Sequence, residues 1–208
     1  MGVETKKPFD INNPSTYIDN LDSLSNVLTI TATGEDIEIF RKNWPKLPEI
    51  DQLKIFEQAS LEQRKMIYFS LDKPTDTTNR KKLLSLMNSE KEPNKRDKYF
   101  TELWKSLVDK TGKPDKKLRE ELFSLLKSED MKDVRDAFNN AVLKEESGKK
   151  ITFEGFGHKD VELTSEGNIK LADGRIIRPD DIISSTSNLK LAADGNTLEY
   201  TLTFKDKT

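Results

Sequence analysis

The chain has 208 residues, of which 34% are hydrophobic and 35% charged, with a net charge of −2 and no cysteine. The lack of cysteine excludes disulfides, thiolate catalysis and Cys-ligated zinc, and the nearly balanced charge argues against a dedicated nucleic-acid binder. No secretory signal is visible at the N-terminus, and no apolar run approaches the ~18 residues that a membrane helix needs. We therefore expect a soluble, cytoplasmic protein, located in the producing cell or, for an effector, in a host cell.

The first 34 residues are rich in Asn, Asp, Ser and Thr. This composition predicts a mostly irregular segment over 1–34, with a short strand at VLTITA, residues 27–32. From residue 35 to 148 the apolar residues recur at helical spacing, which predicts a helical domain.

Three pairs of helices are predicted in that domain, over residues 48–71, 76–110 and 114–146. Ser60 and Gln63 have the spacing of a capping box, which marks a helix start. Pro93 suits the first position of another helix, and Gly112 with Pro114 ends it.

After Gly148 the period changes from helical to alternating, in segments such as KDVELT and NLKLAA, with Gly or Asp-Gly between them. Alternation bounded by such turns predicts short antiparallel strands, so residues 149–208 are expected to form a small β-rich domain. The predicted fold class is therefore α+β.

Residues 80–99 and 119–138 align at an offset of 39 without a gap. The identical pairs at this offset are Arg80/Arg119, Leu83/Leu122, Ser85/Ser124, Leu86/Leu125, Ser89/Ser128, Glu90/Glu129, Arg96/Arg135 and Asp97/Asp136. Two unrelated amphipathic pairs would share leucines, but not a Ser-Glu followed by an Arg-Asp at one offset. A period near ~40 with two helices per unit indicates a helical repeat.

The third helix pair carries the order Leu122, Leu125, Leu126, Asp130, Val134, Arg135, Ala137 and Ala141. This order resembles the HEAT-repeat family, over about residues 48–146, although Val is replaced by Lys95 and Gln63 in the other two pairs. The resemblance implies a short α-solenoid array of about three hairpins, capped by the β-rich unit. It also implies that Arg64, Arg96 and Arg135 brace neighbouring repeats, whereas the alternative is an anion-binding ladder.

No catalytic, cofactor-binding or metal-binding constellation is predicted. His158, beside Asp160, is the single histidine; an exposed loop position explains it, and a general base or metal ligand is the alternative. The solenoid resemblance implies contacts to a partner through exposed polar positions of the second helices. The candidates for such contacts are Lys98, Glu102, Lys105 and Asn139.

The favoured function is a non-enzymatic protein–protein interaction module, acting as a scaffold, adaptor or regulator on another protein. Its Asn, Lys, Ile and Ser richness is compatible with a low-GC genome, so a bacterial effector is one hypothesis. A second hypothesis is salt-dependent nucleic-acid binding, since residues 72–127 hold 15 Lys+Arg against 10 Asp+Glu, or +5. A third is an enzyme with a site near His158.

Overall fold

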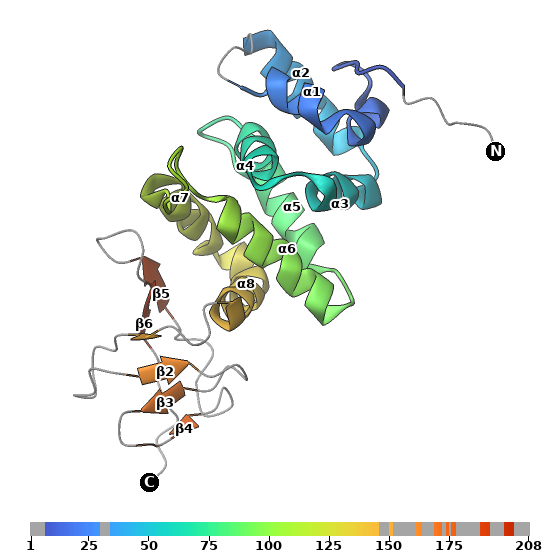
Figure 1. The fold of residues 1–208 in the computed structure, drawn as a ribbon. Coiled ribbons are helices and arrows are strands. Elements are labelled where there is room, and N and C mark those ends of the chain that lie inside the picture. The colour runs from blue at the N-terminus through green and yellow to red at the C-terminus, as the bar shows by residue number, and fades with distance from the viewer. Residues whose placement is uncertain are drawn as a thin grey trace, which may run out of the picture. The chain divides into compact units, whose positions relative to one another are not determined.

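The structure, a computed structural model, describes residues 7–29 and 34–145, six short strand segments given below, and Gly174. The chain forms two compact units, Met1–Ser106 and Leu107–Thr208, and each is described by itself. Figure 1 shows that the described part of the first unit consists of helices joined by short connections.

The helices of the first unit follow one another from residue 14 to residue 106. Three are short 3-10 turns: η1 (Pro14–Thr16), η2 (Ile18–Asn20) and η3 (Trp44–Lys46). Six are α-helices: α1 (Leu21–Val27), α2 (Gly34–Asn43), α3 (Glu49–Gln58), α4 (Leu61–Ser70), α5 (Thr78–Asn88) and α6 (Pro93–Ser106). The sequence predicted mostly irregular structure over 1–34, whereas residues 14–27 form these first short helices. Of the strand predicted at 27–32, Val27 lies in α1 and residues 30–32 lie outside the described residues.

Aromatic packing explains why this N-terminal segment is ordered. Tyr17, Phe40 and Trp44 are buried and form a chain of ring contacts, with centroids 6.0 Å apart for the first pair and 5.6 Å for the second. Buried aromatic rings contribute more apolar area than any other side chains. The segment 14–20 is therefore anchored on α2 by packing that its polar composition does not suggest.

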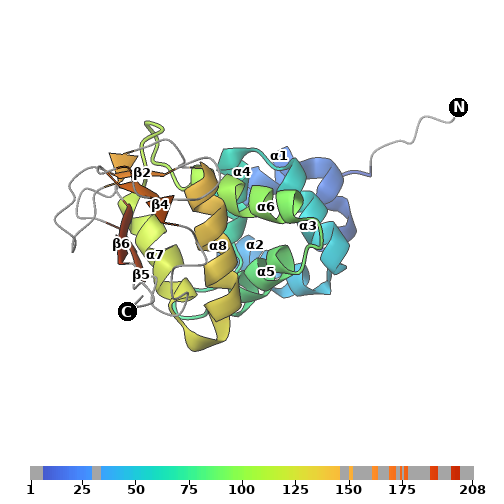
Figure 2. The same cartoon turned by 90° about the horizontal axis from the view of Figure 1, so that it is seen from below.

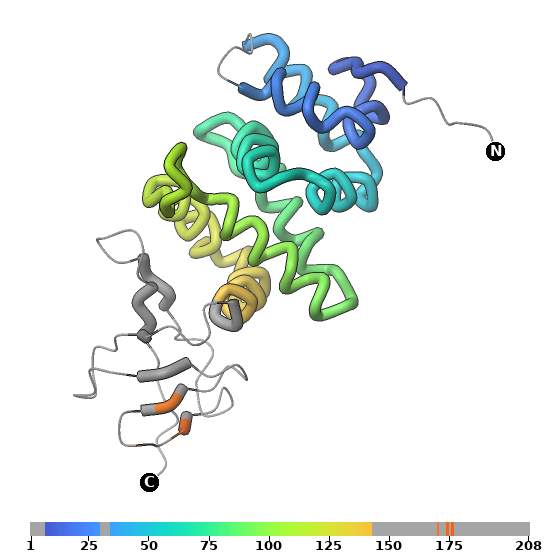
Figure 3. The backbone as a smooth tube through the Cα atoms, viewed as in Figure 1, coloured from blue at the N-terminus to red at the C-terminus, as the bar shows by residue number. Residues whose placement is uncertain are grey.

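The helices of the first unit pack in two rows. The helix α4 lies against α6, and α3 lies against α5, while α1 and α2 both contact α4 (Figures 1 and 2). Each helix buries an apolar stripe in this arrangement; in α5 the stripe is Leu83, Leu84 and Met87. The unbroken path of the backbone through these helices can be followed in Figure 3.

The local signals read from the sequence mark the helix ends correctly. Ser60 Oγ accepts from Gln63 N at 3.3 Å, and Ser60 N donates to Gln63 Oε1 at 2.8 Å, so the predicted capping box is confirmed. Helix α6 begins at Pro93, as predicted. Gly112 adopts a φ of 79°, which L-residues with a side chain rarely adopt, in the turn that follows α6.

The second unit contains the helices α7 (Lys116–Leu126), η4 (Glu129–Met131) and α8 (Lys132–Glu145). Its described strands are β1 (Lys150–Ile151), β2 (Val161–Leu163), β3 (Ile169–Leu171), β4 (Ile176–Ile177), β5 (Asn188–Leu191) and β6 (Leu198–Thr201). The first four pair antiparallel in the order β1-β2-β3-β4, and β5 pairs separately with β6. Within this unit α7 packs against α8, and β5 lies beside α7.

The predicted fold class is wrong. The described part of the chain is helical, and no β-rich C-terminal unit is seen in it: the described strands have only two to four residues each. Pieces this short cannot bury a core of their own. The three helix pairs also do not form one array, because the third pair belongs to the second unit. The predicted domain boundary at 148/149 falls on residues 146–149, outside the described residues, and stays a prediction.

The offset of 39 nevertheless relates matching positions of two helix pairs. Moving α6, Pro93–Ser106, by 39 residues gives the bounds of α8, Lys132–Glu145. The hydroxyls of Ser89 and Ser128 both donate to the carbonyl three residues earlier, at 2.7 Å in each case. Arg80 and Arg119 have the same exposed fraction, 7%. Equivalent residues thus have equivalent surroundings in the two pairs.

Candidate interaction surface

Arg64 connects three helices of the first unit from a buried position on α4. Its Nε donates to the carbonyl of Phe56 at 2.8 Å, and its Nη2 donates to the carbonyl of Glu57 at 2.9 Å. These carbonyls belong to the last turn of α3, where backbone acceptors have no partner within the helix and where a cation is stabilised by the helix dipole. The guanidinium also forms an ion pair with Glu102 on α6. Arg64 therefore braces α3, α4 and α6.

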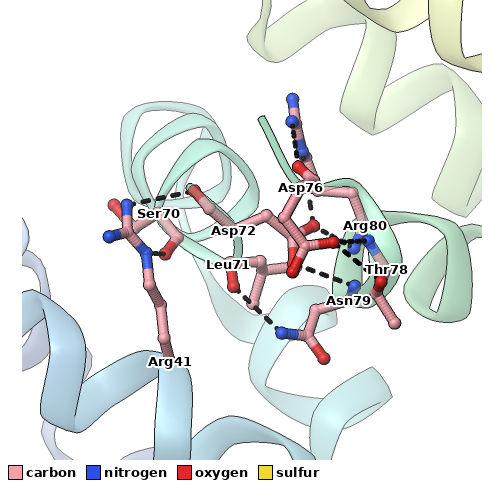
Figure 4. A network of polar contacts seen from close by, with 8 residues as sticks. All are labelled: Arg41, Ser70, Leu71, Asp72, Asp76, Thr78, Asn79 and Arg80. Atoms are coloured by element: carbon pink, nitrogen blue, oxygen red, sulfur yellow. Dashed lines mark hydrogen bonds and ion pairs between the residues drawn. The ribbon is translucent and has the colours of Figure 1, made fainter. Parts of the chain in front are cut away.

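A second network surrounds the carboxylate of Asp72, which is fully buried in the connection between α4 and α5 (Figure 4). It accepts from the backbone N–H groups of Asn79 at 3.0 Å and Arg80 at 2.8 Å, which are in the first turn of α5. The Arg80 guanidinium lies 3.5 Å from the same carboxylate. Since Thr77, the N-cap residue, makes no side-chain cap, Asp72 caps α5 from five residues further upstream.

Arg41 ties α2 to the end of α4. Its Nε donates to the carbonyl of Ser70 at 3.1 Å and its Nη2 to the carbonyl of Asp72 at 3.0 Å (Figure 4). Its Nη1 pairs with Glu38 at 2.8 Å, and Glu38 also lies 3.1 Å from Lys73. Hydrogen bonds from Lys73 and then Arg41 lower the pKa of the Glu38 carboxyl.

The other two recurrent arginines behave differently from Arg64. Both are half-buried: Arg96 lies 3.5 Å from Asp97, and Arg135 lies 3.9 Å from Asp136. These contacts join sequence neighbours and no second helix. The expectation that all three arginines brace neighbouring helices is therefore met, in these contacts, at Arg64 alone.

Lys95, at the start of α6, is surrounded by acceptors from three parts of the first unit. Its Nζ lies 3.6 Å from Glu90 and 4.0 Å from Glu57 on α3, and 5.9 Å from the centre of the Tyr99 ring. A hydrogen bond with Tyr99, followed by the charge of Glu57, raises the pKa of Lys95. Burial raises the pKa of Tyr99. The ammonium of Lys95 is thus held between α3 and the α5–α6 connection.

The four predicted partner-binding residues have different surroundings. Lys98 and Lys105 are exposed on α6, seven residues apart. Glu102, between them, is half-buried and bound to Arg64. Asn139 on α8 is only 4% exposed, and neither of its amide atoms has a hydrogen-bond partner. The structure therefore leaves the two lysines on one open helix face and places Asn139 inside, where the assumption that it is exposed was wrong.

The sequence reasoning missed Asp72 and Arg41. No local signal finds them, because Asp72 caps a helix from outside the usual N-cap position and Arg41 binds carbonyls about 30 residues away. His158 and Asp160 lie outside the described residues. Within the described ranges, no group of three or more His, Cys, Asp or Glu side chains could hold a metal ion. Nor is any helix of those ranges long and apolar enough to cross a membrane.

No protein-family model matches the chain, and no match is found among the curated proteins or the solved structures. The resemblance to HEAT repeats therefore depends on the quoted residues alone.

Proposed function

We propose that the chain is a non-enzymatic protein–protein interaction module, a scaffold, adaptor or regulator, which binds its partner through the exposed face of α6. The observation that carries the proposal is how the polar side chains of the first unit are divided. Those that are buried, such as Arg64 and Asp72, bond to helix ends and hold the helices together. Lys98 and Lys105 instead extend from a helix that this packing holds rigidly.

A rigid helix supports recognition because its side chains lose little additional freedom on binding. Association costs about 0.5–1.5 kcal/mol for each mobile side chain that becomes ordered, and further free energy if the backbone must be ordered too. Helix α6 avoids the backbone cost, since Arg64 and Lys95 fasten it to α3 and α4 at two points along its length.

The test is capture by the full-length chain, immobilised and exposed to a nuclease-treated lysate, followed by reconstitution with the purified partner. We expect a discrete complex with a defined stoichiometry in analytical ultracentrifugation at physiological salt. Capture that disappears after nuclease treatment would favour nucleic-acid binding instead. Failure of every captured protein to form a stoichiometric complex would refute the proposed function.

A further inference from the structure

The solvent-facing side of α6 carries positive charge along two turns. Asn94, Lys98 and Lys105 are all exposed and occupy one side of the helix, at spacings of four and seven residues. At a rise of 1.5 Å per residue, the Cα atoms of Lys98 and Lys105 are about 10 Å apart along the axis. We call these three residues the α6 row.

The acidic residues beside the α6 row do not cancel its charge. The carboxylate of Glu102 is bound by Arg64, which is buried and contributes a full positive charge behind the helix. The carboxylate of Asp97 lies 3.5 Å from the guanidinium of Arg96. Lys98 itself has no ion pair with any carboxylate of the described residues. The row therefore presents net positive charge to the solvent.

We infer that the partner contacts the α6 row with an acidic helix, whose carboxylates are seven residues apart and meet Lys98 and Lys105 together. This inference rests on the proposed function and specifies the chemistry of the partner. Two glutamates at that spacing on a helix are also about 10 Å apart, so one straight helix laid along α6 satisfies both lysines without distortion. The uncharged Asn94 lets the acidic helix continue past the first lysine without repulsion from a carboxylate.

The experiment titrates the ¹⁵N-labelled full-length chain with an alanine-based helical peptide of about 21 residues that carries glutamate at every seventh position. A peptide with glutamine at those positions and a DNA duplex of similar length serve as comparisons. We expect amide shifts on α6 with the glutamate peptide and none with the glutamine peptide. Larger shifts on α6 with the duplex than with the glutamate peptide, at equal concentration, would overturn the inference.

The variant Lys98→Glu/Lys105→Glu is expected to bind the glutamate peptide about tenfold more weakly, because two attractive contacts become repulsive. Lys82→Glu/Lys91→Glu is the matched control: it changes the net charge equally at two exposed positions of the same unit. The control is expected to bind nearly as the original chain does. Equal losses in both variants would show a general charge effect and refute the row as the site. All four lysines are exposed, so circular dichroism should show unchanged folding in both variants.

The two failures can be told apart. A captured partner that still binds the Lys98→Glu/Lys105→Glu variant with unchanged affinity overturns the α6 row while the proposed function stands. Binding of the glutamate peptide at α6 without any stoichiometric protein complex overturns the proposed function while the acid-binding row stands.

Discussion

The buried carboxylate of Asp72 gives the sharpest test of how the first unit is held together. The substitution Asp72→Ala removes the acceptor for two N–H groups in the first turn of α5 and the acid that faces Arg80. Losing a helix cap costs about 1 kcal/mol. Breaking a buried ion pair by removing one partner costs about 3–5 kcal/mol, because the remaining charge stays buried.

The lower end of that range applies at this position. Arg80 keeps its bond to the Asp76 carbonyl at 3.1 Å, and its guanidinium lies about 6 Å from the rings of Tyr68 and Phe69. We therefore expect Asp72→Ala to lower the free energy of unfolding by about 3 kcal/mol. For a chain of this size, that corresponds to a fall in Tm of roughly 6–12 °C.

Urea unfolding followed by circular dichroism measures this loss directly. Asp76→Ala is the matched control, since Asp76 is an exposed acid of the same connection that accepts from Thr78 N and Oγ1. It should cost clearly less than Asp72→Ala. Asp72→Asn, which keeps one acceptor oxygen, should fall between the two. Adding Arg80→Leu to Asp72→Ala should recover part of the loss, because the unpaired charge is then removed. Equal losses for Asp72→Ala and Asp76→Ala would refute the reasoning.

Three further predictions follow from single side chains. Burial raises the pKa of Tyr17 to about 12 and its hydroxyl donates to the Ile11 carbonyl at 2.6 Å; because the neutral form is favoured in the folded state, its contribution to stability is complete below pH ~10 and is lost as the pH rises through about 12. An ultraviolet titration should show one late tyrosine that is absent from Tyr17→Phe, and a normal pKa at that position would contradict the burial. Ser60→Ala should cost about 1 kcal/mol through loss of the capping box, whereas Ser85→Ala, in the exposed middle of α5, should be nearly neutral in the same urea assay. Asn139→Leu should stabilise the chain by about 1 kcal/mol, because it removes a buried amide that has no partner; a lower Tm than that of the original chain would show that the amide is satisfied in solution.

The sequence by itself determined where most of the helices begin and end. Ser60 with Gln63, Pro93 and Gly112 act through bonds and backbone angles within a few residues, so their effects can be predicted without knowing the rest of the chain. The same holds for the offset of 39, which relates equivalent positions of two helix pairs. It did not determine the fold class, because alternation in a sequence does not say how long the paired strands become.

Only the tertiary structure decided which polar residues are used internally and which are left for a partner. Arg64 and Asp72 look like ordinary surface charges in the sequence, and their roles arise from helix ends that come near them in space. Glu102 and Asn139 occupy second-helix positions much as Lys98 does, yet one is bound by Arg64 and the other is buried. Helical periodicity specifies an angle around the helix axis, whereas burial depends on which neighbours cover that angle. The two lysines of α6 are therefore identified as a candidate surface by packing that no local pattern contains.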